Sequence, residues 1–486
     1  MCSDGPMTED SSTTQTTPLA TAISGLSMRG IGPAFMGGRI ADLAVHPANK
    51  STWYLAVGSG GVWKTTNAGT TWSPIFDDQQ SFSIGCVTLD PNQPDIVWVG
   101  TGEAVSGRHV AWGDGVYRSR NGGATWDHMG LRQSEHIAEI LVDPRDSDVV
   151  YVAAEGPLWS GDGQRGVYKT TNGGESWHQA LRIDADTGVT SLAFAPDDPD
   201  TLYAAAYQRR RRVWSFLGGG PGSAIYKTSN GGDSWREITH GLPKGDMGKI
   251  GLAVTPASPD TVYATVEADA ETRGFYRSTD RGESWQRRNE YISGGTGPHY
   301  YQEIFASPTD PERVYQVDVF VHWTPDGGKT IQRLETGRTK HSDNHLVWID
   351  PDDGEHLLIG ADAGLYETFD HGESFRHIPN LPISQFYRVA TDNAEPFYNI
   401  LAGAQDLGTL YGPSRTTGVE GVRSQDWSVT LGADGYHVAF DPEDPNICYM
   451  EWQNGNVMRM DRRTMELQDI QPQGQPGDDP ERWNWD

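Results

Sequence analysis

Cysteine is scarce in this chain of 486 residues, which contains only Cys2, Cys86 and Cys448. Cys86 and Cys448 lie in apolar segments with strand character, where a buried free thiol is the usual state of a cysteine. The composition therefore argues against a disulfide framework as the basis of the fold. Long hydrophobic runs are missing as well, because no apolar stretch approaches the ~18 residues that indicate a membrane-spanning helix.

Positive charge is also in short supply. Lysine and arginine together number 38 against 66 aspartates and glutamates, which gives a net charge of −28. Such a surface repels phosphate backbones and anionic lipids, so the composition argues against nucleic acid or a membrane surface as a partner. The excess of acid is interpreted as a solvated coat that keeps the protein soluble. The single compact basic run, Arg209 to Arg212, is predicted to lie in a loop between two strands.

Glycine and tryptophan are abundant, with 58 and 17 copies, and few segments have helical periodicity, which favours an all-β fold. An eight-residue unit reads TTNAGTTW at 65–72 and SRNGGATW at 119–126. The unit occurs seven times, at residues 65–72, 119–126, 170–177, 228–235 and 278–285 and, in weaker form, at 324–331 and 368–375. The copies are spaced by 54, 51, 58, 50, 46 and 44 residues, and internal repetition with such a period is typical of a propeller.

The repeated unit follows the pattern hydroxyl, any, Asp or Asn, any, Gly, any, hydroxyl, aromatic. The Asp or Asn can accept hydrogen bonds from the backbone N–H groups that follow it and so stabilise a tight turn. The glycine supplies a backbone angle that other residues resist, and the closing aromatic ring can pack between neighbouring sheets. These features predict a β-hairpin with a specialised tip, the Asp-box.

Each box is preceded by a strand-like segment that ends in a turn with proline, as in IADLAVHP at 40–47. Another strand-like segment follows that turn, as in VVYVA at 149–153. Together with the strands on either side of the box, each cycle supplies the four strands of one propeller blade. Two further cycles without clear boxes, at 386–409 and 436–460, bring the total to nine.

The sequence therefore predicts an all-β fold, a β-propeller of four-stranded blades with Asp-box hairpins. Residues 28–380, which hold the seven boxes, are predicted to close as a seven-bladed propeller. Residues 381–486 are predicted to be two further blades at the start of a second, truncated propeller. One ring of about ten blades is the alternative.

Residues 1–27 hold few apolar side chains and are predicted to be a flexible tether. Their start, MCSD followed by a Ser/Thr-rich stretch, looks like the mature start of a bacterial lipoprotein, in which Cys2 would carry the lipid and anchor the protein to a membrane. A chance cysteine near a disordered start is the alternative.

Asp-boxes at this density resemble those of sortilin-type receptors, microbial xyloglucanases and a group of large secreted bacterial propeller proteins. The resemblance to the last group spans residues 28–486. Its segments read TGE at 101–103, WGDGVY at 112–117, GPHYY at 297–301, QD at 405–406 and DGY at 434–436. Members of that group are commonly labelled glycosyl hydrolases or sortilin-like proteins, although a shared fold does not establish a shared function.

Two catalytic sets of Asp-box enzymes have no counterpart in this chain. The xyloglucanases place a catalytic Asp in a TDIGG segment after the first strand, whereas this chain reads VGSGG at 57–61 and has Gly58 in the place of that Asp. An inverting glycosidase needs two carboxyl groups, so the loss of one puts this activity in doubt. Sialidases need an arginine cluster that opens with an RIP segment, and RIA at 39–41 does not match it.

Polar residues before or at the start of the inner strands converge on the mouth of a propeller channel and are the candidates for ligand binding. They are His299, Tyr300, Glu303, His341, Asp343, His345, Gln405, Asp406, Asp434 and His437. The sharpest set is His341, Asp343 and His345, because positions i, i+2 and i+4 of a strand face the same way. These three are predicted to lie on one inner strand and to face the channel. There they could ligate a metal ion or bond to their neighbours instead.

The sequence thus predicts an extracellular or cell-envelope propeller that binds a glycan or a peptide at the channel mouth, without a cofactor unless a divalent metal binds there. A glycoside hydrolase with a carboxylate pair unlike that of the xyloglucanases is the first alternative, and its candidate carboxylates are Asp42, Asp343 and Asp434. An envelope assembly scaffold with protein partners is the second alternative, and it would show an exposed apolar patch.

Overall fold

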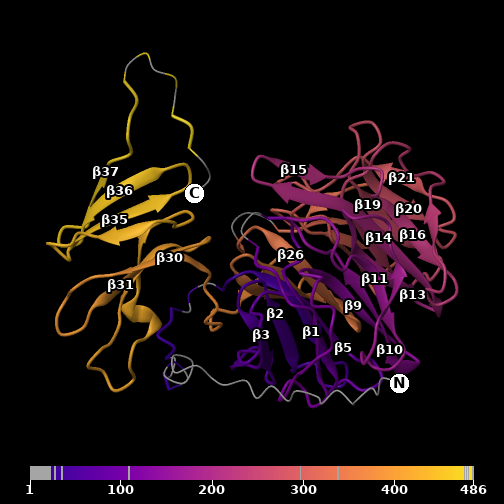
Figure 1. The fold of residues 1–486 in the computed structure, drawn as a ribbon, viewed down its shortest axis with the longest axis horizontal. Helices are drawn as coiled ribbons and strands as arrows, with labels where there is room; N and C mark the ends of the chain where they lie inside the picture. The colour runs from indigo at the N-terminus through magenta and orange to yellow at the C-terminus, as the bar shows by residue number, and fades with distance from the viewer. Residues whose placement is uncertain are drawn as a thin grey trace, which may run out of the picture.

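In the computed structural model the regular secondary structure of the described residues is almost entirely antiparallel β-sheet (Figure 1). The structure describes residues 23, 25–26, 29–33, 35, 37–107, 110–295, 297–335, 339–475, 477, 479 and 481–483. Most of the predicted tether, with Cys2, lies outside these residues. Among the described residues, no helix has the length and apolar character needed to cross a membrane.

Nine sheets follow one another along the described chain, and each has four strands that run in order from an inner to an outer edge; in the fourth sheet an additional strand pairs with the second strand. The inner strands are β1 (Ile40–Val45), β5 (Ile84–Leu89), β9 (Ile137–Asp143), β13 (Thr187–Ala195), β18 (Ile250–Val254), β22 (Ile304–Ala306), β26 (Asn344–Asp350), β30 (Phe386–Thr391) and β34 (Val438–Phe440). The second strands are β2 (Trp53–Val57), β6 (Val97–Thr101), β10 (Asp146–Ala154), β14 (Asp198–Arg212), β19 (Val262–Val266), β23 (Val314–Gln316), β27 (Asp353–Ala361), β31 (Asn399–Ala404) and β35 (Ile447–Trp452).

The outer half of each sheet is a hairpin. The third strands are β3 (Gly61–Thr65), β7 (Val116–Ser119), β11 (Gly166–Thr170), β16 (Ala224–Thr228), β20 (Gly274–Ser278), β24 (His322–Thr324), β28 (Gly364–Thr368), β32 (Gly408–Pro413) and β36 (Asn456–Asp461). The fourth strands are β4 (Ser73–Pro74), β8 (Asp127–His128), β12 (His178–Leu181), β17 (Arg236–Ile238), β21 (Gln286–Asn289), β25 (Gln332–Arg333), β29 (Arg376–His377), β33 (Ser428–Leu431) and β37 (Glu466–Asp469). The predicted all-β propeller of four-stranded blades is confirmed.

The first seven inner strands adjoin one another in chain order, and β26 of the seventh sheet also contacts β1 of the first. They enclose a cavity of about 220 Å³ that residues of all seven strands line. Strands β30 and β34 contact each other, and their sheets lie to one side of the others, coloured orange to yellow in Figure 1. The division of the chain at residue 380 remains a prediction.

Apolar side chains fill the spaces between adjacent sheets. Between the seventh and first sheets, Ile40, Leu43 and Leu55 pack against Leu346 and Leu358, all at most 6% exposed. Sheets of the first seven therefore bury apolar side chains against one another, and the contact between the last and first of the seven is apolar too.

The seven Asp-boxes have the predicted hydrogen bonds. In the third box, Asn172 Oδ1 accepts from the Thr170 hydroxyl at 2.7 Å and from the Ser176 backbone N–H at 3.0 Å. Gly174 has φ +90°, which only glycine adopts freely. The closing Trp177 donates its indole N–H to the Met129 carbonyl of the preceding sheet at 2.6 Å, so the ring packs between sheets as predicted.

The basic run departs from the prediction of a loop. Arg209 to Arg212 form the end of β14, which extends beyond its sheet and pairs with β15 (Ser215–Gly218). Arg209 is fully buried and forms an ion pair with Glu155 at 3.0 Å. The buried acidic partner of Arg209 lies outside the run, so the local sequence does not indicate it.

Candidate functional site

A buried polar network surrounds Arg39, which directly precedes β1. The Arg39 guanidinium forms ion pairs with Asp362 Oδ1 at 2.5 Å and Glu103 Oε1 at 2.6 Å, and it also contacts the Tyr300 hydroxyl. These side chains are at most 7% exposed. Asp362, in the turn between β27 and β28, further bonds His345 Nε2 at 2.6 Å and Gln405 Nε2 at 2.7 Å.

The charges of this network, which comprises Arg39, Glu103, Tyr300, His345, Asp362 and Gln405, compensate one another. Burial alone would raise the pKa of Asp362, but the adjacent Arg39 and His345 lower the pKa well below its usual range. Three predicted ligand residues, Tyr300, His345 and Gln405, thus belong to this network, and Gln405 carries the network to the turn between β31 and β32.

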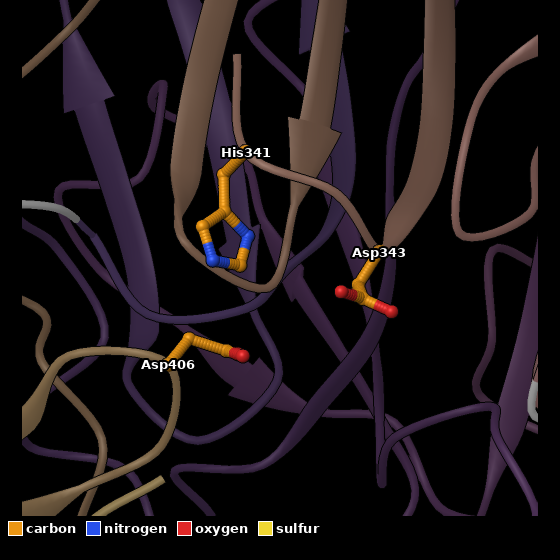
Figure 2. Close-up of side chains that lie close together, drawn as sticks. All are labelled: His341, Asp343 and Asp406. Atoms are coloured by element: carbon orange, nitrogen blue, oxygen red, sulfur yellow. The ribbon is translucent and has the colours of Figure 1, made fainter. Parts of the chain in front are cut away.

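Next to this network lies a half-buried cluster formed by His341, Asp343 and Asp406, which we call the His-Asp cluster. The candidate ligand atoms of the three side chains all lie within 4.8 Å of one another, and Figure 2 shows the side chains directed toward a common space. His341 and Asp343 come from the loop before β26, and Asp406 comes from the turn between β31 and β32. The cluster therefore joins a ring loop to a turn of the eighth sheet.

Asp406 has a carboxyl group whose surroundings raise its pKa. Its backbone N–H donates to Asp434 Oδ1 at 2.8 Å, while its buried Oδ2 has no hydrogen-bond partner among the described residues. Burial and, after it, the charges of Asp362, Asp434 and Asp343 raise the pKa of Asp406 to about 8.

The structure overturns the prediction that His341, Asp343 and His345 lie on one strand. Strand β26 begins only at Asn344, and Asp343 has a left-handed backbone with φ 65°. A bulge between Asn344 and Leu346 breaks the alternation of side chains around His345. His345 consequently turns to Asp362, and Asp406 from another sheet takes the third place in the cluster.

Asp434 adjoins the cluster through its bond to Asp406, whereas the remaining predicted residues lie apart from it. Asp42 and Glu303 line the central cavity. Asp42 accepts the Val87 backbone N–H at 2.8 Å and so links β1 to β5, and burial raises its pKa to about 6. Glu303 forms an ion pair with Lys249 at 2.5 Å. Half-buried His299 packs on Phe216 with ring centres 5.1 Å apart, and burial lowers the pKa of His299 to about 4. His437 is exposed.

Sequence reasoning missed Asp362, the central acceptor of the Arg39 network, because ADAG at 361–364 reads as an ordinary hairpin turn.

The structure also explains why residue 58 is a glycine. A side chain at this position would meet the Glu103 carboxylate, whose Oε1 lies 2.5 Å from the Cβ that residue 58 would have. The space beside Gly58 is thus filled by the Glu103 carboxylate, which is itself bound to Arg39.

Comparisons with known proteins agree with this architecture. The family model described as "Sortilin, neurotensin receptor 3" (Sortilin-Vps10) matches residues 114–274. Among curated proteins, a xyloglucanase of Hypocrea jecorina is 25% identical over 69% of this chain and 47% of its own length. An oligoxyloglucan-reducing end-specific xyloglucanase of Emericella nidulans is 23% identical over 42% of this chain and 24% of its own. The chain thus spans about half or less of the length of these relatives.

Solved structures show the same fold. A GH74 enzyme of Niastella koreensis superposes with a TM-score of 0.61 at 15% identity, over 91% of this chain and 67% of the other. A GH74 xyloglucanase of Xanthomonas campestris gives a TM-score of 0.60 at 14% identity, over 92% of this chain and 75% of the other. The chain is an Asp-box β-propeller protein that matches a sortilin family model over residues 114–274, with xyloglucanases among its relatives.

Proposed function

We propose that this protein binds a glycan beside the His-Asp cluster, where the loop before β26 meets the turn between β31 and β32. The observation that carries the proposal is the convergence of half-buried carboxylates and an imidazole from two separate sheets on one space (Figure 2). Carboxylate oxygens accept hydrogen bonds from sugar hydroxyls, and a few convergent polar groups are typical of a ligand site.

Neighbouring groups support a polyhydroxylated ligand over an apolar one. Asp434 extends the row of carboxylates through its bond to Asp406. Tyr387 and Tyr436 stack with ring centres 4.9 Å apart, and the Tyr387 hydroxyl donates to Gln405 at 3.0 Å. Tyr436 is buried and Tyr387 is half-buried, so the Tyr387 ring is the one that could contact a sugar, which has both apolar faces and hydroxyl rims. The names of the xyloglucanase relatives favour xyloglucan as the first glycan to test.

The experiment measures binding and hydrolysis in parallel on a polysaccharide panel that includes xyloglucan, with EDTA present. We expect binding without release of reducing ends, and the D434N variant should bind at least ~5-fold more weakly, because it loses one charged acceptor. D233N, an exposed aspartate in an Asp-box, is the matched control. No binding to any glycan would refute the proposal, whereas release of reducing ends would identify a hydrolase.

We also propose an extracellular or cell-envelope location, with anchoring through a lipid on Cys2. The proposal is supported by the resemblance of residues 1–4 to a lipoprotein start. Fractionation of cells that express the chain behind a lipoprotein signal, for wild type and C2S, tests it. Release of C2S but not of wild type into the soluble envelope fraction is expected.

A further inference from the structure

We propose that His341, Asp343 and Asp406 bind a divalent metal ion of the zinc or manganese class, a function beyond glycan recognition. The three ligand atoms lie within 4.8 Å of one another, which is compatible with coordination of a single ion at about 2.0–2.4 Å from each. The site spans two sheets, so the ion would tie the loop before β26 to the turn between β31 and β32 (Figure 2).

The histidine is oriented as a metal ligand requires. His341 Nδ1 lies 3.0 Å from the Ser342 carbonyl oxygen, to which it donates its proton. This bond leaves the lone pair on Nε2 for an ion. Metal-binding histidines commonly donate their second ring N–H to a carbonyl or carboxylate in this way, which holds the ring in place.

The two carboxylates, Asp343 and Asp406, differ in their hydrogen-bond partners. Asp343 accepts from the Tyr301 hydroxyl at 2.5 Å and from the Ser342 hydroxyl at 2.5 Å, and such bonds orient a ligating carboxylate. Asp406 Oδ2 is buried and has no hydrogen-bond partner among the described residues, although it belongs to the same cluster. A buried carboxyl oxygen without a partner is costly, and a bound cation would satisfy it.

The charges around the cluster are unbalanced in favour of a cation. The nearby Lys340 is paired with Glu335 at 3.2 Å, and Arg39 is paired with Glu103 and Asp362. Within the described part of the chain, no lysine or arginine forms an ion pair with Asp343, Asp406 or Asp434. Lys340 and Arg39 act on Asp343 and Asp406 without an ion pair, and a divalent ion would compensate these carboxylates directly.

The donor set selects the class of metal. One imidazole nitrogen and two carboxylate oxygens suit zinc and manganese, and three protein ligands leave further positions open for water or a sugar hydroxyl. Calcium takes six to eight oxygen ligands and has no preference for imidazole. We therefore expect zinc or manganese to bind more tightly than calcium.

The test uses the full chain after dialysis against EDTA, with no glycan present, so its outcome is separate from that of the glycan assay. Calorimetric titration and metal analysis with Zn²⁺, Mn²⁺ and Ca²⁺ should give one equivalent of Zn²⁺ or Mn²⁺. H341A and D406N should bind at least ~10-fold more weakly. Exposed His437, changed to alanine, is the matched control and should bind like wild type.

Thermal melting of each variant without metal checks its fold, and a rise in Tm on adding metal should occur in wild type and H437A only. If D406N does not fold, H341A and D343N decide the outcome. The proposal is overturned if wild type binds less than a stoichiometric amount of zinc and manganese, if only calcium binds, or if folded H341A and D406N bind as wild type does.

Discussion

At the scale of the residue, burial inside the ring changes the pKa of individual carboxyl groups. Glu139 on β9 is an example, and it lines the central cavity with Asp42 and Glu303. Its Oε2 accepts the Leu192 backbone N–H at 2.7 Å and so links β9 to β13. Burial, and to a lesser degree the charges of Asp42 and Glu303, raise the pKa of Glu139 to about 8.

This raised pKa predicts a pH dependence of stability. Glu139 is protonated more readily in the folded than in the unfolded state, so its contribution is complete below pH ~4.5 and is lost as the pH rises toward about 8. E139Q keeps the acceptor for Leu192 without the charge. Between pH 5 and 9 the free energy of unfolding of wild type should therefore fall by about 1–3 kcal/mol more than that of E139Q.

Chemical denaturation at a series of pH values measures this difference. Exposed Glu237 on β17 provides the control, since E237Q should reproduce the pH profile of wild type. Parallel profiles for wild type and E139Q would contradict the assignment of a raised pKa to Glu139.

At the scale of the element, the Asp-box hairpin stabilises each of the first seven sheets through side-chain hydrogen bonds over eight residues. The first four boxes use Asn at the third position and the last three use Asp. Both residues accept the same backbone N–H through Oδ1, as Asn172 and Asp280 do from Ser176 and Ser284. The turn therefore depends on the acceptor oxygen and not on a charge.

The hairpin between β11 and β12 tests this dependence. N172A removes the bonds to Thr170 and Ser176 and should cost about 1–2 kcal/mol of unfolding free energy. N172D keeps the acceptor, and the Ser176 hydroxyl can turn to donate to it, so this variant should stay within about 0.5 kcal/mol of wild type. Equal losses in both variants, measured by urea denaturation, would show that the amide and not the acceptor matters.

At the scale of the whole molecule, few side chains join the seven sheets of the ring to the sheets that begin with β30 and β34. Trp427 lies outside the ring, where it packs against Leu407 and Leu410. Its indole N–H donates to the Ile31 carbonyl oxygen at 2.9 Å. Apart from such contacts, each part has its own apolar core.

This arrangement predicts two unfolding transitions in calorimetry. W427A should lower the transition of the β30–β37 part, since loss of a buried tryptophan costs about 3–5 kcal/mol, and should leave that of the ring unchanged. W214A at the exposed tip next to β15 is the control and should alter neither transition. A single transition that shifts as a whole in W427A would mean that the two parts unfold together.

The sequence by itself determined the fold class, because the Asp-box bonds form within eight residues and recur at 44 to 58 residue intervals. Turn hydrogen bonds of this kind do not depend on distant contacts, so the sequence alone predicts them. The sequence also identified His341, Asp343 and Asp406 as candidate ligand residues, though not as one group.

Only the tertiary structure decided which side chains meet. Arg39 and Asp362 are 323 residues apart in sequence and pair because β26 closes against β1. The strand periodicity that grouped His345 with His341 and Asp343 fails where the backbone turns at Asp343 and bulges at β26. Asp406 joins the cluster because a turn of another sheet reaches this loop. Such contacts depend on how sheets pack, and no local pattern encodes them.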